Sequence, residues 1–206
     1  KFLCANPGYH DLIMAQVEEL CQNYRMEGFW FDIYQAHRLC FCEACRQEMA
    51  SLGIDLEDKD AVAAFNGQVM KRHCRALRER IAKYPPRANV FFNGTTAIEH
   101  GLNFRHEMYA HNTVQDLEDL PTVWGGYDKL PLQSKYFLKA GYPITAMSGK
   151  FHTAWGEFGG FKHPNALRYE AASMIAWGAN CNFGDQLHPC GEMDVATYKN
   201  IGEAYA

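Results

Sequence analysis

The sequence lacks several features that define other classes of protein. No apolar run approaches the roughly 18 residues of a membrane-spanning helix, and the N-terminal residues lack the charged-then-apolar form of a signal peptide. There is no long basic run and the formal net charge is -4, so we expect neither a membrane nor a nucleic acid as a partner. No glycine-rich phosphate loop follows any expected strand, which argues against nucleotide binding.

What is present is typical of a folded domain with a sizeable core. The chain has 206 residues, of which 48% are hydrophobic and 21% charged, an ordinary globular balance. Aromatic residues reach 14%, which suits either sugar-stacking surfaces or a core rich in rings. Three of the eight cysteines fall within six residues, and this spacing favours metal binding over a disulfide framework. We therefore expect a reducing compartment, the cytoplasm.

Short apolar strands alternate with amphipathic helices along the whole chain. This alternation predicts parallel strands joined by right-handed crossovers. We expect strands at 28–34, 88–94, 112–120, 142–152 and 179–189, and helices at 10–24, 60–83, 130–141, 163–178 and after Asp194, which caps the last one.

The apolar spacing also predicts which face of three helices is buried. Each set recurs every three or four residues, as one face of a helix requires. The sets are Ile13, Val17, Leu20 and Tyr24; Met70, Cys74, Leu77 and Ile81; and Tyr198, Ile201 and Tyr205.

Five strands are too few for a complete (β/α)₈ barrel, which needs eight strands in about 250 residues. We predict a TIM-type (β/α)₈ barrel in which residues 1–206 supply strands four to eight, the C-terminal portion of a catalytic domain. The alternative is a complete open α/β sheet.

Each expected strand ends in polar or aromatic residues. In a barrel of this type the active site lies at the C-terminal ends of the strands, so these residues are candidates for one pocket. They are Asp32 and Tyr34; Asn93; Glu118 with Asp116 and Asp119; Lys150, His152, Trp155 and Glu157; and Asp185, Gln186 and His188.

Glycoside hydrolysis needs two carboxyl groups that flank one bond. Asp32, at the tip of an apolar strand, is our candidate nucleophile; its structural alternative is a buried acid paired with an arginine or lysine. Glu118 is the preferred acid/base because a strand end positions a side chain better than a loop. Glu157 and Asp185 are the alternatives.

Other side chains near the strand ends are candidates for sugar binding. Aromatic rings stack on the apolar face of a sugar, and polar groups bond its hydroxyls. The stacking candidates are Trp124, Tyr127, Trp155 and Phe158, and the polar candidates are Asn93, His152, Asp185, Gln186 and His188.

The stretch CFCEAC places Cys40, Cys42 and Cys45 at a spacing that can wrap one side of a tetrahedral zinc ion. Cys4 is the preferred fourth ligand, ahead of Cys21, Cys74 and His37. Such a site is closed and structural, so we expect no catalytic cofactor. The alternatives are free or partly oxidised thiols, and a redox pair formed by Cys42 and Cys45.

Several motifs, in order along almost the whole chain, resemble a bacterial group of glycoside hydrolases called hypothetical glycosyl hydrolase 6, which is related to the alpha-L-fucosidases of families 29 and 151. The motifs are CANPGYHDLIMAQVEEL, GFWFDI, CFCEAC, LEDLPTVWGGYDKLP, GKFHTAWGEFGGFKHPNALRYE and GDQLHPCGEMD. The resemblance implies that Asp32 is the nucleophile, and it does not fix the acid/base residue.

The cysteine stretch also resembles the zinc cluster of family 42 beta-galactosidases, which supports zinc at Cys4, Cys40, Cys42 and Cys45. The group usually continues into a trimerisation-like domain, which implies a homo-oligomeric full-length protein, a trimer. The expected function is that of a retaining glycosidase acting on a terminal sugar such as an alpha-L-fucoside. The alternatives are a non-catalytic carbohydrate-binding barrel and a zinc-stabilised structural domain.

Overall fold

The computed structural model describes residues 3–34, 39–84, 87–98, 107–157 and 159–206. The chain divides into two compact units, Lys1–Thr113 and Val114–Ala206. None of the helices in these described ranges is both long enough and apolar enough to cross a membrane.

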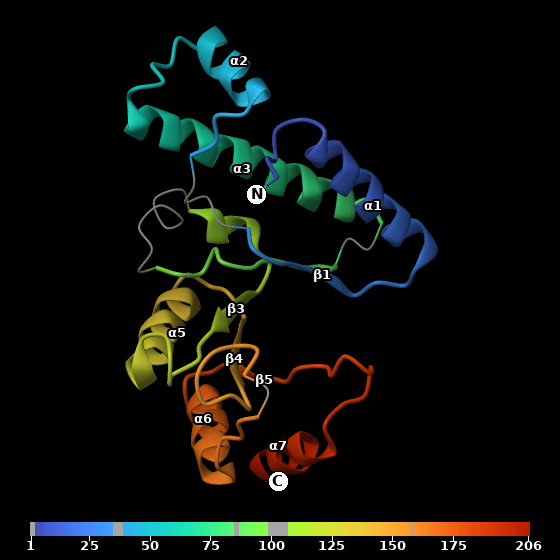
Figure 1. The fold of residues 1–206 in the computed structure, drawn as a ribbon, viewed down its shortest axis with the longest axis vertical. Coiled ribbons are helices and arrows are strands. Elements are labelled where there is room, and N and C mark those ends of the chain that lie inside the picture. The colour runs from blue at the N-terminus through green and yellow to red at the C-terminus, as the bar shows by residue number, and fades with distance from the viewer. Residues whose placement is uncertain (1–2, 35–38, 85–86, 99–106, 158) are drawn as a thin grey trace. The chain divides into compact units, whose positions relative to one another are not determined.

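The first unit contains two parallel strands, a helix before the first of them and two helices between them. Gly28 pairs with Asn89 and Phe31 with Phe92, so the strands run in register over their full length. A side chain at Gly28 would meet the carbonyl oxygen of Asn89 at 2.8 Å, so glycine permits this close pairing. The elements are α1 (Tyr9–Asn23), β1 (Gly28–Phe31), α2 (Glu43–Ser51), α3 (Lys59–Ile81), β2 (Asn89–Phe92) and the short 3₁₀ helix η1 (Met108–His111) (Figure 1).

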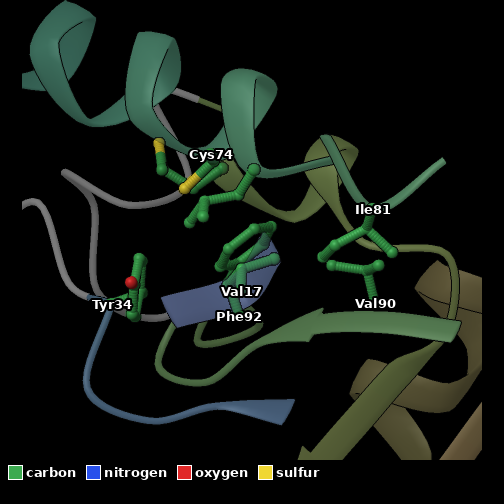
Figure 2. Packing of buried hydrophobic residues seen from close by; sticks show 8 residues of the cluster. Val17, Tyr34, Cys74, Ile81, Val90 and Phe92 are labelled. Carbon is green, nitrogen blue, oxygen red and sulfur yellow. The ribbon is translucent and has the colours of Figure 1, made fainter. Parts of the chain in front are cut away.

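The main core of this unit lies between the helices and β2. Figure 2 shows Val17 of α1, Cys74 and Ile81 of α3, and Val90 and Phe92 of β2 gathered in this core. The predicted face of the 60–83 helix is confirmed, because Cys74, Leu77 and Ile81 are buried and Met70 is packed against them.

The predicted face of the first helix is wrong at its C-terminal end. Val17 is buried and Ile13 packs against the core, but Leu20 is 38% exposed and Tyr24 is 62% exposed. Tyr24 follows the last helical residue in extended conformation, so its side chain leaves the helical face.

A second, smaller core lies under α2, a helix that the sequence reasoning did not predict. It joins Cys45 and Met49 of α2 to Val62, Phe65 and Val69 of α3, with Cys4 and Cys40 packed at its edge. The side chain of Asp58 accepts from the backbone N–H groups of Asp60 and Ala61, which starts α3 beside this core.

The second unit contains a three-stranded parallel sheet in the order β3-β4-β5. Helices α5 and α6 pack beside these strands (Figure 1). The elements are β3 (Gln115–Glu118), η2 (Gly126–Asp128), α5 (Lys129–Lys139), β4 (Ile144–Gly149), α6 (Pro164–Ala176), β5 (Asn180–Gly184) and α7 (Val195–Tyr205).

The residues predicted to start or end helices α6 and α7 are found at those helix ends. Pro164 occupies the first turn of α6, and Gly178 follows that helix with φ +78°, a conformation that glycine adopts at no steric cost. The side chain of Asp194 accepts from the N–H of Ala196 and caps α7.

The buried face of α7 differs from the prediction. Tyr198 is 58% exposed and Tyr205 is 54% exposed, whereas Thr197 is fully buried. The ring of Tyr205 packs by its edge on Phe183, and its hydroxyl donates to the carbonyl oxygen of Cys181 at 3.3 Å. Tyr205 therefore lies against β5 while more than half of its surface stays exposed, and Tyr198 is exposed to a similar degree.

All five predicted strands are present, and every observed pairing is parallel, which confirms the α/β class. The observed strands are four to six residues long and lie inside the predicted ranges. Apart from Asp116, which lies within β3, the candidate polar residues follow the strands or end them, as a site at the C-terminal edge of a parallel sheet requires.

Candidate functional site

Asp32 directly follows β1 and is held by two hydrogen bonds to one of its oxygens. Asn93, which follows β2, donates from Nδ2 to Oδ1 of Asp32 at 2.9 Å, and the backbone N–H of Ile33 donates to the same oxygen at 2.9 Å. Asn93 is itself buried, and its backbone N–H donates to the carbonyl oxygen of Phe31 at 2.7 Å. Parallel pairing of β1 and β2 thus brings these two candidates together. Among the described residues no basic side chain forms an ion pair with Asp32.

The backbone beside this carboxylate is strained. Ile33 has φ 57°, the left-handed conformation that β-branched residues avoid, and its side chain is 61% exposed. Such strain costs about 1–3 kcal/mol and persists only where surrounding contacts fix it. Here the next residue, Tyr34, is buried and its N–H donates to the carbonyl oxygen of Asn93 at 2.8 Å.

Tyr34 begins a chain of polar contacts, buried at Tyr34 and His73 and partly buried at His10, that reaches α1. Its hydroxyl lies 3.3 Å from Nε2 of His73 on α3, and Nδ1 of His73 lies 2.7 Å from Nδ1 of His10. Burial, and secondarily the neighbouring His10, lowers the pKa of His73 from 6.5 to about 4. Burial raises the pKa of Tyr34. Both groups are therefore neutral near pH ~7, and the turn after Asp32 is anchored in the core.

In the second unit, Glu118 ends β3 and Trp155 lies over the ends of β4 and β5. The indole Nε1–H donates to Oε1 of Glu118 at 2.5 Å. A side chain at Gly184 would meet the Trp155 ring at 2.2 Å, and one at Gly149 would meet it at 3.0 Å. Two glycines at strand ends therefore make the space in which this ring reaches Glu118.

Glu157, the alternative acid/base, has a different environment. Its Oε2 accepts from the backbone N–H groups of His152 and Thr153 at 2.7 and 2.8 Å. The hydrogen bond from Thr153, supported by the one from His152, lowers the pKa of Glu157. This direction is opposite to the one that a general acid needs.

Two further candidates form a buried ion pair at the ends of β4 and β5. Nζ of Lys150 lies 3.2 Å from Oδ1 of Asp185, and both side chains are more than nine-tenths buried. Lys150 also lies 5.0 Å from the ring centre of Phe161. A Cβ atom at Gly156, in the loop that carries Trp155, would lie 3.9 Å from the side-chain amide of Gln186. The carbonyl oxygen of His188 accepts from the N–H of Gly191 at 2.8 Å.

Tyr127 is tied to a network that the sequence reasoning missed. Its hydroxyl donates to Oε1 of Glu170 at 3.2 Å, and this carboxylate also binds Nζ of Lys162 at 2.9 Å and the hydroxyl of Ser148 at 2.6 Å. Glu170 lies in register with the buried apolar residues of α6, and an acid on an apolar face was the available signal. Trp124, by contrast, is 36% exposed.

Four cysteine sulfurs form a cluster that could hold a metal ion. The Sγ atoms of Cys4, Cys40, Cys42 and Cys45 all lie within 4.8 Å of one another. Four thiolates around one zinc ion at ~2.3 Å lie ~3.8 Å apart, so the residues fit such an ion. Burial raises the pKa of Cys4 to about 11 and raises that of Cys45, and a bound cation would reverse this by binding the thiolates.

Two residues named by the sequence reasoning, His37 and Phe158, lie outside the described part of the chain.

No protein-family model matches the chain, and no curated protein sequence matches it. Among solved structures, it is similar to alpha-L-fucosidase isoenzyme 2 from Paenibacillus thiaminolyticus, with 43% identity and a TM-score of 0.89 over 98% of this chain. The chain spans 30% of the length of that fucosidase.

Two more distant structures show the fold alone. The alpha-L-fucosidase AlfC from Lactobacillus casei, in complex with its alpha-L-fucose product, is 13% identical over 93% of this chain and 42% of its own, with a TM-score of 0.50. The PgaB (BpsB) glycoside hydrolase domain from Bordetella bronchiseptica is 12% identical over 91% of this chain and 61% of its own, with a TM-score of 0.61.

Proposed function

We propose that this chain is part of a glycoside hydrolase that acts on a terminal alpha-L-fucoside, and that it supplies strands four to eight of a (β/α)₈ barrel. The observation that carries the proposal is its 43% identity, over 98% of its residues, to an alpha-L-fucosidase. The parallel strands with polar C-terminal ends support the same conclusion from the chain's own geometry.

Asp32 is the proposed nucleophile. A carboxylate that attacks must be held in place, and hydrogen bonds from Asn93 and Ile33 fix the position of Oδ1. Both bonds end on Oδ1, so Oδ2 is the oxygen that we expect to form the bond to the sugar. The strained turn at Ile33 supports this role, because such strain clusters at functional sites.

Glu118 is the proposed acid/base. The indole N–H of Trp155 donates to Oε1 and holds the carboxyl group at the end of β3. In the retaining reaction, Asp32 displaces the leaving oxygen while Glu118 protonates it, which gives a glycosyl ester. Glu118 then takes a proton from water as the water oxygen breaks the ester, which frees the sugar and Asp32.

Zinc bound by Cys4, Cys40, Cys42 and Cys45 is the proposed structural metal. Four thiolate ligands leave no open position, so the ion would stabilise α2 and the residues before it rather than act on the substrate.

The carboxylates are tested with a full-length protein and a nitrophenyl alpha-L-fucoside. We expect Asp32→Ala to abolish turnover and added azide to restore it with formation of a glycosyl azide, because azide replaces the missing nucleophile. We expect Glu118→Ala to slow substrates with poor leaving groups by about 10²–10⁴-fold and activated aryl fucosides much less.

Asp194→Asn is the matched control, because asparagine also caps a helix and leaves the strand ends unchanged. Full activity of Asp32→Ala would refute the nucleophile assignment. A wild-type protein that binds fucose without cleaving the fucoside would identify a carbohydrate-binding barrel instead.

A further inference from the structure

Asn6 lies between the cysteine cluster and a charged pair on α2 and α3. Its backbone N–H donates to Sγ of Cys4 at 3.4 Å. Its side-chain Nδ2 donates to Oε2 of Glu48 at 2.8 Å and lies 3.8 Å from Sγ of Cys45. One residue therefore directs N–H groups at two of the four sulfurs.

Hydrogen-bond chemistry determines which end of the Asn6 side-chain amide faces Glu48. The carboxylate of Glu48 accepts hydrogen bonds only, so the group facing it must be the NH₂ end of the amide. That nitrogen carries two hydrogens, and one bond to Glu48 leaves the second for Cys45.

The carboxylate of Glu48 is in turn fixed by Arg72 on α3. The two guanidinium nitrogens donate to its two oxygens at 2.6 and 3.0 Å, a bidentate geometry that holds both groups in one plane. Arg72 lowers the pKa of Glu48, so the carboxylate stays charged and stays an acceptor. A chain of contacts thus runs from α3 through Glu48 to the sulfurs.

We propose that Asn6 is a positioning residue for the metal centre, which it stabilises by donating hydrogen bonds to the ligand sulfurs while Glu48 and Arg72 hold its amide in place. This inference rests on the proposed metal binding. Four thiolates and one divalent cation carry a net charge of -2, and N–H donors are the means by which a protein compensates such a charge in a partly buried site. Loss of an outer contact of this kind typically lowers metal affinity about 10–100-fold.

The test measures zinc affinity by competition with a chromogenic chelator, using the full chain with zinc alone as the probe. We expect Asn6→Ala to weaken zinc binding about 10–100-fold. We expect Asn6→Asp to weaken it further, because it adds a negative charge beside the thiolates and beside Glu48. A purely structural role would not separate the two variants by charge.

Gln47→Ala is the matched control. Gln47 is the neighbour of Glu48 on α2, is exposed, and donates to Glu43 rather than to a sulfur, so its loss should leave zinc affinity unchanged. Cobalt substitution checks that each variant retains a four-thiolate spectrum and hence a folded site. Wild-type protein without zinc uptake would overturn the metal proposal itself. Zinc uptake with equal affinity in wild type and Asn6→Ala, or an Asn6→Asp no weaker than Asn6→Ala, would overturn the role of Asn6 alone.

Discussion

His73 shows how a single imidazole is accommodated in the core beside a candidate catalytic turn. It is 1% exposed and lies between the hydroxyl of Tyr34 and the ring of His10. A neutral imidazole has one donor nitrogen and one acceptor nitrogen, so the ring satisfies both neighbours without carrying charge. The sequence held a signal for this, because His73 lies four residues after Val69 and four before Leu77, both of them buried.

The lowered pKa of His73 predicts a pH-dependent stability. In the unfolded chain His73 binds a proton near pH 6.5, whereas in the folded chain it binds one only near pH 4. The contribution of His73 to the free energy of unfolding is therefore complete above about pH 6.5 and decreases by about 3 kcal/mol as the pH falls to about 4. Urea unfolding at several pH values across this range measures the change in the free energy of unfolding. Hydrogen exchange of the α3 amides over the same pH range provides a second measurement.

His73→Gln keeps a polar partner for Tyr34 and removes the titration, so its stability should vary less with pH than that of the wild type. His163→Asn, which keeps a capping side chain on α6, is the control and should follow the wild-type curve. Parallel curves for the wild type and His73→Gln would contradict the assignment.

At the scale of elements, the ends of β4 and β5 are shaped around one aromatic ring. Gly149 and Gly184 end these strands, and a Cβ atom at either would overlap the side chain of Trp155 or Phe151. The ring cannot shift far and still donate to Glu118. Sequence spacing predicted the strands and placed Trp155 and Glu118 near their ends, but a pairing across 37 residues depends on packing that no local pattern encodes.

Gly184→Ala should displace Trp155 and lower the stability of the second unit by about 1–3 kcal/mol, as overpacking does. Near-ultraviolet circular dichroism and tryptophan fluorescence would report the movement of the ring. Gly202→Ala is the matched control: this glycine lies in α7 with open space around it, so alanine should stabilise the helix by about 1 kcal/mol. An unchanged tryptophan signal in Gly184→Ala would show that the contact is not rigid.

Helix prediction succeeded where capping and long apolar spacing agreed, and failed where the segment was short. α2 has nine residues, and its buried positions are Cys45 and Met49. The cysteine spacing assigns Cys45 to a metal site and leaves Met49 unassigned. The exposed tyrosines of α7 have another cause. Tyrosine rings can lie over a sheet edge while remaining half in solvent, so aromatic spacing overstated the burial of that face.

At the scale of the whole molecule, the cores are separate and unequal. The first unit has a main core between α1, α3 and β2 and a small one under α2, and the second unit is built around its own sheet. A core as small as the one under α2 supplies little stability by itself, and small cores commonly depend on a metal or a cross-link. The cysteine cluster lies at this core.

Removal of the proposed zinc ion should therefore act locally. We expect a chelator to increase hydrogen exchange in α2 and in the first turns of α3, and to leave the amides of β3, β4 and β5 unchanged. Exchange measured by mass spectrometry on peptides from each element, before and after chelation and after zinc is restored, provides the comparison. A uniform increase over both units, or no increase in α2, would contradict a structural role confined to the small core.

Ile33 has a consequence for how this chain tolerates change. An exposed, β-branched residue in a left-handed conformation adds little to the core, so replacement by glycine or asparagine would release strain there. Selection for heat resistance alone is thus expected to enrich substitutions at this position. The same relaxation would make the position of the Asp32 carboxylate less well fixed. Selection for thermal stability and selection for turnover should therefore favour different amino acids at position 33.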